Sequence, residues 1–232
     1  MIDVSVLDDP VGQSLGGPHA HLARRLGGAA TYRTDVATFS AVPVQPEARD
    51  WADLAALLGP GAFADMFSCP ACPPPGWEPV FSLAGRQLIW SGGPLPGRRG
   101  DEPDSDMVVL GEDDVPEMLD LVARTEPGPF WSRTHELGTY LGVKVDGTLV
   151  AMAGERLRPP GWTEISAVCT APEARGQGHA ARLVRTLAAR ILERGDRPFL
   201  HVAEANTGAI ALYERLGFRT RRQMTFRGFR TP

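Results

Sequence analysis

The chain has 232 residues, of which 43% are hydrophobic and 22% charged, and this composition excludes the collagen-like, disordered and disulfide-stapled classes of protein. It has no run of about 18 apolar residues that could span a membrane, its N-terminus carries Asp3, Asp8 and Asp9 where a signal peptide needs positive charge, and its three cysteines fit a reducing compartment, so we expect a cytoplasmic protein. The net charge of −4 argues against a general nucleic-acid binder, although the segment from Arg175 to Arg230 carries 12 arginines against four acidic residues and predicts an anionic ligand there.

The first 105 residues give weak structural signals. A helix is expected over Trp51–Leu58, and the extended segment Trp77–Trp90 predicts a hairpin that turns near Gly85. Glycine, proline and charged residues then fill Ser91–Ser105, which is typical of a linker or a long surface loop. We therefore expect residues 1–105 to form an accessory N-terminal α/β region, which could be a degenerate half domain or a lid over a binding pocket.

Cys69 and Cys72 form a Cys-x-x-Cys pair inside a proline-rich loop. A zinc site would need two more ligands at motif spacing, and no second pair follows. A redox pair would begin a helix, which a proline-rich loop does not offer. We expect free thiols and no metal site.

From residue 106 onward the pattern becomes regular. A short strand is expected at Met107–Leu110, and a helix follows it. The runs Thr139–Val145 and Thr148–Arg156 are joined by Asp146-Gly147, a strong tight-turn pair, and predict a hairpin. A third extended run, Trp162–Thr170, follows, so we expect three adjacent antiparallel strands.

The remaining elements alternate between helix and strand. Apolar residues from Ala180 to Ile191 recur at helical spacing and predict a helix. A buried strand is expected at Pro198–Val202, and Asn206 or Thr207 can cap a further helix. We take residues 106–232 as the second domain.

The segment Arg175-Gly176-Gln177-Gly178-His179-Ala180 lies between the third strand and the long helix. Glycines at such a junction let the backbone approach a ligand closely, and the unpaired amides of the first helical turn bind anions. The segment therefore predicts a pyrophosphate site. Gly176, Gly178 and Ala181 also fit a dinucleotide-binding pattern with Glu204 as ribose partner, but four residues separate the strand from the glycines and the preceding strands are antiparallel, which disfavours this alternative.

These residues together resemble the GNAT superfamily of acetyl-CoA-dependent N-acetyltransferases. The pyrophosphate motif of that family, Q/R-x-x-G-x-G/A, is matched by Arg175, Gly178 and Ala180. Its closing helix is similar to Asn206 and the segment Ala211–Phe218. The resemblance implies an α/β (α+β) fold with a mixed, mostly antiparallel central sheet flanked by helices.

The resemblance runs from about Met107 to Phe229 and implies where acetyl-CoA would bind. Backbone groups of Val168 and Thr170 would hold the pantetheine arm where the sheet opens. Amides of the segment Arg175–Ala180, the glycine segment, would hold the diphosphate, and Arg182 would meet the 3′-phosphate. The residues expected to bind the cofactor are Val168, Cys169, Thr170, Arg175, Gly176, Gln177, Gly178, His179, Ala180, Arg182, Asn206 and Tyr213.

The resemblance also implies catalytic residues. Tyr213 stands at the family's usual proton-donor position, and Glu164 is on the strand that carries the general base in several of its enzymes. A water chain is an alternative to a single base. Further candidates for the base are Glu155, Glu136, His135 and His201.

The segment Pro127–Gly138 lies where the family places an acceptor-side loop, so the residues expected to bind the acceptor are Phe130, Trp131, Arg133 and Glu136. The expected reaction is direct transfer of an acetyl, or larger acyl, group from CoA to a primary amine of a small molecule or peptide. We expect no metal, no nucleic-acid partner and no membrane partner, and leave a homodimer open. The alternatives are a non-catalytic acyl-CoA sensor and, less favoured, a dinucleotide-binding protein.

Overall fold

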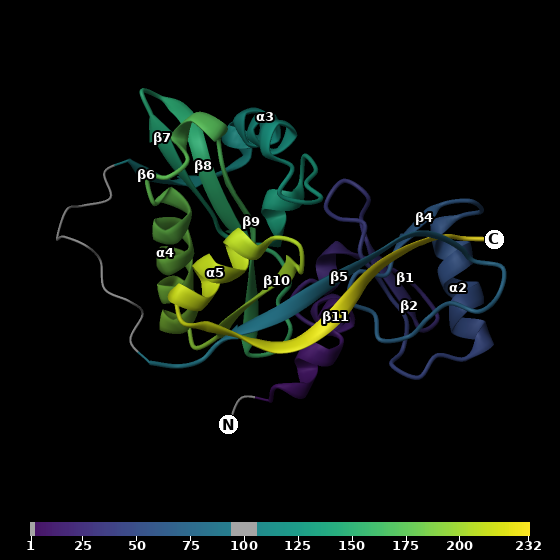
Figure 1. Cartoon of the computed structure of the whole chain (residues 1–232). Coiled ribbons are helices and arrows are strands. Elements are labelled where there is room, and N and C mark those ends of the chain that lie inside the picture. Colours follow the sequence, from purple (N-terminus) through teal and green to yellow (C-terminus); the bar gives the residue numbers. More distant parts are fainter. Residues whose placement is uncertain (1–2, 94–105) are drawn as a thin grey trace.

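A computed structural model describes residues 3–93 and 106–232 (Figure 1). The α-helices are α1 (Pro10–Gly16), α2 (Ala48–Leu58), α3 (Val115–Thr125), α4 (His179–Glu193) and α5 (Thr207–Arg215). The strands are β1 (Ala23–Leu26), β2 (Ala29–Tyr32), β3 (Ser40–Ala41), β4 (Phe63–Asp65), β5 (Glu78–Trp90), β6 (Met107–Leu110), β7 (Tyr140–Val145), β8 (Thr148–Glu155), β9 (Trp162–Thr170), β10 (Arg197–Ala203) and β11 (Phe218–Arg230).

The central sheet has eight strands in the order β4-β11-β5-β10-β9-β8-β7-β6. Strands β9 and β10 are parallel to each other, and the other pairs of neighbouring strands in this sheet are antiparallel. Helices α3 and α4 pack on β8 and β9, and α5 packs on β11. The predicted fold class, a mixed and mostly antiparallel sheet flanked by helices, is confirmed.

The sheet opens between β9 and β10. The two strands pair over only three positions, from Trp162 opposite Arg197 to Glu164 opposite Phe199. The pairing stops there, although β9 continues to Thr170 and β10 to Ala203. The opening exposes backbone edges in the middle of the sheet, where neighbouring strands would otherwise satisfy them.

The prediction of a hairpin over Trp77–Trp90 is wrong. The segment forms one long strand, β5, which pairs with β10 on one side and β11 on the other. Gly85 lies in its middle because a Cβ there would come within 2.4 Å of the Phe226 ring. The glycine permits a close approach in the strand, and it was mistaken for a turn.

The N-terminal region has a small sheet of its own, in the order β1-β2-β3, and also supplies β4 and β5 to the central sheet. In Figure 1, β5 and β11 run from the part that contains α4 and α5 to the part that contains α2 and β4. The predicted boundary at residue 105 thus lies between regions that share one sheet. Of the predicted linker, residues 94–105 lie outside the described residues.

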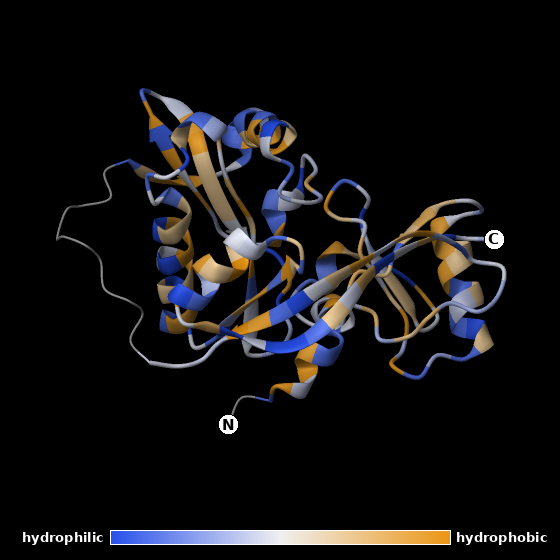
Figure 2. Cartoon of the chain, viewed as in Figure 1, coloured by the Kyte–Doolittle hydropathy of each residue, from blue (hydrophilic) through white to orange (hydrophobic). Residues whose placement is uncertain are grey.

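Amphipathic helices close the cores, as the alternating colours along α4 in Figure 2 show. Leu183, Val184, Leu187 and Ile191 on α4 are fully buried against the sheet. The helix ends beside Gly195, whose φ of +89° is the left-handed conformation expected after a helix C-terminus. The predicted turn at Asp146-Gly147 likewise has positive φ at both residues.

Candidate active site

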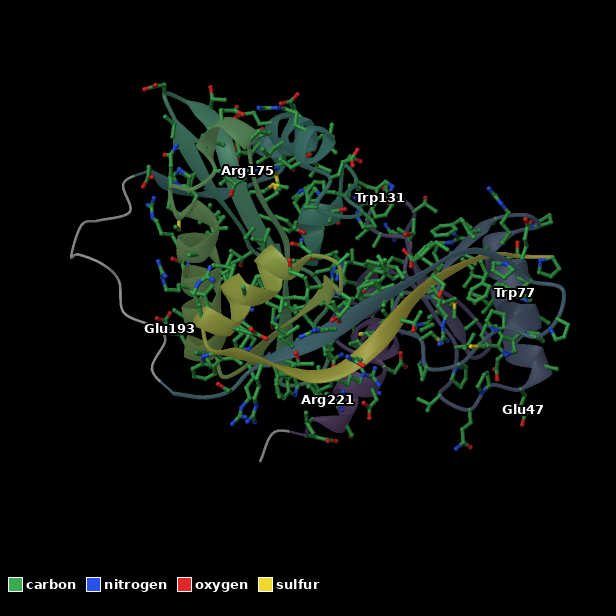
Figure 3. The ribbon with its side chains drawn as sticks, in the orientation of Figure 1. Glu47, Trp77, Trp131, Arg175, Glu193 and Arg221 are labelled. Atoms are coloured by element: carbon green, nitrogen blue, oxygen red, sulfur yellow. The ribbon has the colours of Figure 1, made fainter. Side chains whose placement is uncertain are left out.

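A cavity of about 750 Å³ begins in the opening between β9 and β10 and continues over β4, β5 and β11. Arg175 and Trp131 both line it. Figure 3 shows Arg175 at the part of the molecule formed by β8, β9 and α4, and Trp131 on the side nearer the N-terminal strands. The cavity therefore joins the predicted cofactor residues to residues of the N-terminal region.

A bulge in β9 lies at the opening. Ser166 pairs with Gly154 and Cys169 with Met152, so Ala167 and Val168 together lie opposite one residue of β8. Ala167 has a φ of +51°, an uncommon conformation for a residue with a Cβ. Such a bulge turns backbone groups out of the ladder, and it lies where Val168 and Thr170 were predicted to hold a ligand.

Cys169 also lines the cavity, next to the bulge. Burial raises the pKa of its thiol to about 11, so the thiol is protonated at neutral pH. A protonated thiol is a poor nucleophile, which agrees with direct transfer rather than an acyl-enzyme.

The glycine segment forms the predicted junction before α4. Gly176 and Gly178 have φ of +80° and +81°, and a Cβ on either would project into open space. Gly178 is the N-cap of α4, so the N–H groups of the first turn have no carbonyl acceptor within the helix. Arg175 lines the cavity and its Nε donates to the Thr170 carbonyl at 3.3 Å. This donor set fits a diphosphate.

The other predicted cofactor residues have varied environments. Gln177 lies in the loop, and Ala180 and Asn206 line the cavity, where the Asn206 side chain also accepts from the Ala209 amide at 3.1 Å and caps α5. Arg182 donates to Asp106 at 2.6 and 3.0 Å. His179 is buried at the first turn of α4, and within the described ranges neither of its ring nitrogens has a hydrogen-bond partner.

Tyr213 projects from α5 into the wall of the cavity, and its ring packs edge-on against Phe218. Burial raises the pKa of its phenol to about 12. The hydroxyl therefore carries its proton throughout the neutral range, as a proton donor must.

Glu164 is fully buried in a cluster of charged groups. Its carboxylate accepts two bonds from Arg156, at 2.6 and 2.8 Å, and one from His201 Nδ1 at 2.6 Å. Burial acts to raise the pKa of Glu164, but Arg156 and His201 outweigh it and the pKa lies at about 2. A carboxylate so stabilised is a weak proton acceptor. The surroundings of Glu164 therefore suit a structural ion pair better than the predicted role of general base.

The cluster continues across the sheet. Gln87 donates to His201 Nε2 at 3.1 Å and accepts from Arg221 at 2.9 Å, so the neutral His201 ring carries its proton on Nδ1. Arg221 also pairs with Asp8 at 2.7 Å, as does Arg222 at 3.3 Å. Arginines of the basic segment thus bind acidic residues of the N-terminal region, which accounts for part of the charge that predicted an anionic ligand.

The predicted acceptor segment separates into different environments. Trp131 lines the cavity, whereas Phe130 packs edge-on against Tyr140 in the core. Arg133 bridges Glu136 and Asp35, at 2.5 and 2.9 Å, and so ties this segment to the N-terminal region.

Asp65 is a cavity residue that the sequence analysis missed. It is 4% exposed, it lines the cavity beside Phe67, and its Oδ2 accepts from the Thr38 hydroxyl at 2.8 Å. Burial raises its pKa to about 6, against the lowering effects of Thr38 and Arg156. The signal that could have indicated it is the alternation Phe63-Ala64-Asp65-Met66-Phe67, which places an acidic residue on an aromatic face of a strand.

Among the residues that the structure describes, no group of three or more His, Cys, Asp and Glu side chains could hold a metal ion. Cys69 is buried and Cys72 is exposed, and both are free thiols. Within residues 3–93 and 106–232, every helix is too short or too polar to cross a membrane.

Comparison with known proteins agrees with this geometry. Residues 140–227 match the model of the FR47-like protein family, whereas no curated protein matches the chain. A solved structure from Novosphingobium aromaticivorans, assigned as a GNAT-family acetyltransferase, is 42% identical and superposes with a TM-score of 0.86 over 98% of this chain and 99% of its own.

Two more distant structures show the fold. A GCN5-related N-acetyltransferase from Kribbella flavida is 15% identical, with a TM-score of 0.63 over 100% of this chain and 97% of its own. A GCN5-related N-acetyltransferase-like protein from Streptococcus suis is 17% identical, with a TM-score of 0.54 over 99% and 97%. The N-terminal region is therefore part of a recurrent arrangement.

The dinucleotide-binding alternative is wrong, and its proposed ribose partner Glu204 instead pairs with Arg86. The chain belongs to the GNAT family of acetyltransferases.

Proposed function

We propose that this protein transfers an acetyl group from acetyl-CoA directly to a primary amine. The observation that carries the proposal is the opening between β9 and β10, where a backbone bulge lies in one cavity with Tyr213 and with Arg175 and Ala180, the two ends of the glycine segment. Acetyl-CoA supplies an activated thioester, and the protein must hold it, orient the amine and manage two protons.

The binding role falls to the glycine segment and β9. Amides of Gln177–Ala180 at the start of α4 would bind the diphosphate, and Arg175 adds a positive charge at the same wall. Backbone groups of Val168 and Thr170, at the bulge, would bind the pantetheine arm. The Asp106 carboxylate already engages Arg182, so we do not assign the 3′-phosphate to Arg182.

The catalytic role falls to Tyr213. As the new C–N bond forms and the C–S bond breaks, the thiolate leaves with the bonding electron pair and takes the phenolic proton. The amine must attack in its neutral form, and the proton that it loses after attack passes to solvent water, from which the Tyr213 phenolate regains its proton. We propose that Glu164 acts by positioning Arg156 and His201 in the cavity wall, because its own electron pairs are already engaged.

Thiol release from acetyl-CoA in the presence of a panel of primary amines tests the function. Tyr213→Phe keeps the ring and removes the proton, so we expect kcat to fall about 100-fold while the affinity for CoA and the melting temperature change little. Tyr140→Phe, in the core against Phe130, is the matched control and should leave kcat unchanged.

Two outcomes would contradict the proposal. Tight binding of CoA without thiol release for any amine would identify an acyl-CoA-binding sensor. A Tyr213→Phe variant that melts several degrees lower with kcat preserved would show that the hydroxyl is structural.

A further inference from the structure

The part of the cavity away from the glycine segment has an aromatic floor, defined here as Phe63, Phe81, Leu83 and Phe226. These residues lie on one face of β4, β5 and β11, and all line the cavity. Two glycines make the floor possible. The Phe226 ring lies over Gly85, and the rings of Phe63 and Phe81 lie over Gly228, where a Cβ would come within 2.5 Å of them.

The aromatic floor is only partly covered by the protein. Phe63, Phe81 and Leu83 are 37%, 38% and 44% exposed. Large apolar side chains that gather on one exposed surface mark binding sites more often than isolated ones do. Their continuity with the cavity indicates a ligand that has an apolar body.

Asp65 provides the polar group of this surface. It lies on the same strand face as Phe63, and within the described ranges its Oδ1 has no hydrogen-bond partner. Burying a carboxylate oxygen without a partner is costly, so an external donor at this position would be favourable. Arg156 does not supply that donor, since Oδ1 has no partner among the described residues and two of the three guanidinium nitrogens bond Glu164 instead.

The rings around Asp65 favour a positive charge. Phe67 stacks on Phe226 with 4.5 Å between centroids, and the Arg156 guanidinium already lies 4.7 Å from the Phe67 centroid. Aromatic faces attract cations, and a carboxylate beside them adds a charge-assisted hydrogen bond.

We propose that Asp65 and the aromatic floor bind the acceptor, as a small amine whose ammonium group contacts the Asp65 carboxylate and whose apolar or aromatic body lies on the floor. That this ligand is the acceptor rests on the proposed function. Asp65 is then a specificity-determining residue that the N-terminal region contributes to the active site.

Three probes of similar shape and different charge test the inference: phenethylamine, phenethyl alcohol and phenylpropionate. Their binding to the full-length protein, without CoA, is measured by calorimetry. We expect the amine to bind at least about tenfold more tightly than the alcohol, because a hydrogen bond to a charged group is worth at least this factor, and the carboxylate to bind most weakly. Asp65→Asn should reduce the preference for the amine over the alcohol to about twofold or less.

Asp35→Asn is the matched control, because Asp35 belongs to the same region but already pairs with Arg133. It should keep the preference for the amine. Phe81→Ala should weaken the amine and the alcohol equally, since it removes part of the floor and no charge. Equal binding of amine and alcohol to the wild-type protein overturns the inference, even if Asp65→Asn does not fold.

The kinetic outcomes separate this inference from the proposed function. If amines are acetylated and Asp65→Asn leaves their KM unchanged, the inference fails and the function stands. If phenethylamine binds through Asp65 and no amine is acetylated, the function fails, whereas the cation site stands as a ligand site of another kind.

Discussion

Glu164 on β9 and Asp65 at the end of β4 are both buried carboxylates near Arg156, and their surroundings are opposite. Glu164 accepts from Arg156 and His201, and its pKa lies at about 2. Asp65 accepts from one neutral hydroxyl, and burial raises its pKa to about 6. Burial alone therefore does not decide the role of a carboxylate. Glu164 is stabilised by the Arg156 charge and the His201 N–H, which the protein itself supplies, whereas Oδ1 of Asp65 has no such partner and, on the inference above, binds an external cation.

Glu164→Gln tests the support that Arg156 and Glu164 give each other. The substitution leaves Arg156 buried without a full counter-charge, and removal of one partner of a buried pair costs about 3–5 kcal/mol. We expect urea denaturation to show a loss of that size in the free energy of unfolding. Glu204→Gln, at the more exposed pair with Arg86, is the control and should cost less than about 1 kcal/mol. A loss as small as the control's would show that the cluster around Glu164 is dispensable.

Gly178 lies at the N-terminus of α4, where the diphosphate of CoA would bind. Gly178→Glu adds a side chain and a negative charge where the diphosphate would approach, and the loss of two charge-assisted hydrogen bonds would weaken CoA binding on the order of 100-fold. Gly195→Glu is the matched control, because Gly195 also has positive φ and open space around its Cβ but lies at the other end of α4. Calorimetry that finds equal affinities for CoA in the two variants would refute the site.

The pH dependence of stability should distinguish the two carboxylates, with a modest effect at Asp65. The folded state raises the pKa of Asp65 from 3.8 to about 6, so its ionisation opposes folding above pH 6, and this cost disappears as the pH falls from about 6 to 4. Asp65→Asn should therefore raise the free energy of unfolding by about 1–3 kcal/mol at pH 7 and leave it nearly unchanged at pH 4.

Glu164 should show the opposite sign in the wild-type protein. Its pKa falls from 4.5 to about 2 on folding, so its stabilising contribution is complete above pH 4.5 and is lost as the pH falls towards 2. Unfolding measured across this range checks both carboxylates. A destabilised Asp65→Asn variant at pH 7 would show that the carboxylate serves the fold.

The residues proposed to bind the cofactor could be predicted from the sequence because their signals are local. The segment Arg175–Ala180, the strand Trp162–Thr170 and the helix that begins after Asn206 each contain their own spacing and capping information. The bulge at Ala167 has no comparable local signal, because its conformation is set by pairing with β8.

The acceptor side could not be predicted in the same way. β4 has three residues, and Asp65 gains its meaning only where β4 pairs with β11, more than a hundred residues later in the chain. Gly85 looked like a turn because the Phe226 ring that needs its space is equally remote in sequence. Glu164 was placed on the correct strand, but its partners Arg156 and His201 come from two other segments, and their distances decide its chemistry.

The position of β5 between β10 and β11 has a consequence for how the protein is made. β5 leaves the ribosome more than a hundred residues before either strand that flanks it. Both of its hydrogen-bonding edges therefore stay unpaired until β10 and β11 have been synthesised. Sheets that depend on such distant pairing form slowly, and unpaired strand edges are prone to aggregation in the meantime. The same late pairing brings Phe226 over Gly85 and Gly228 beside Asp65, so Asp65 and the aromatic floor come together only when β11 pairs with β4 and β5.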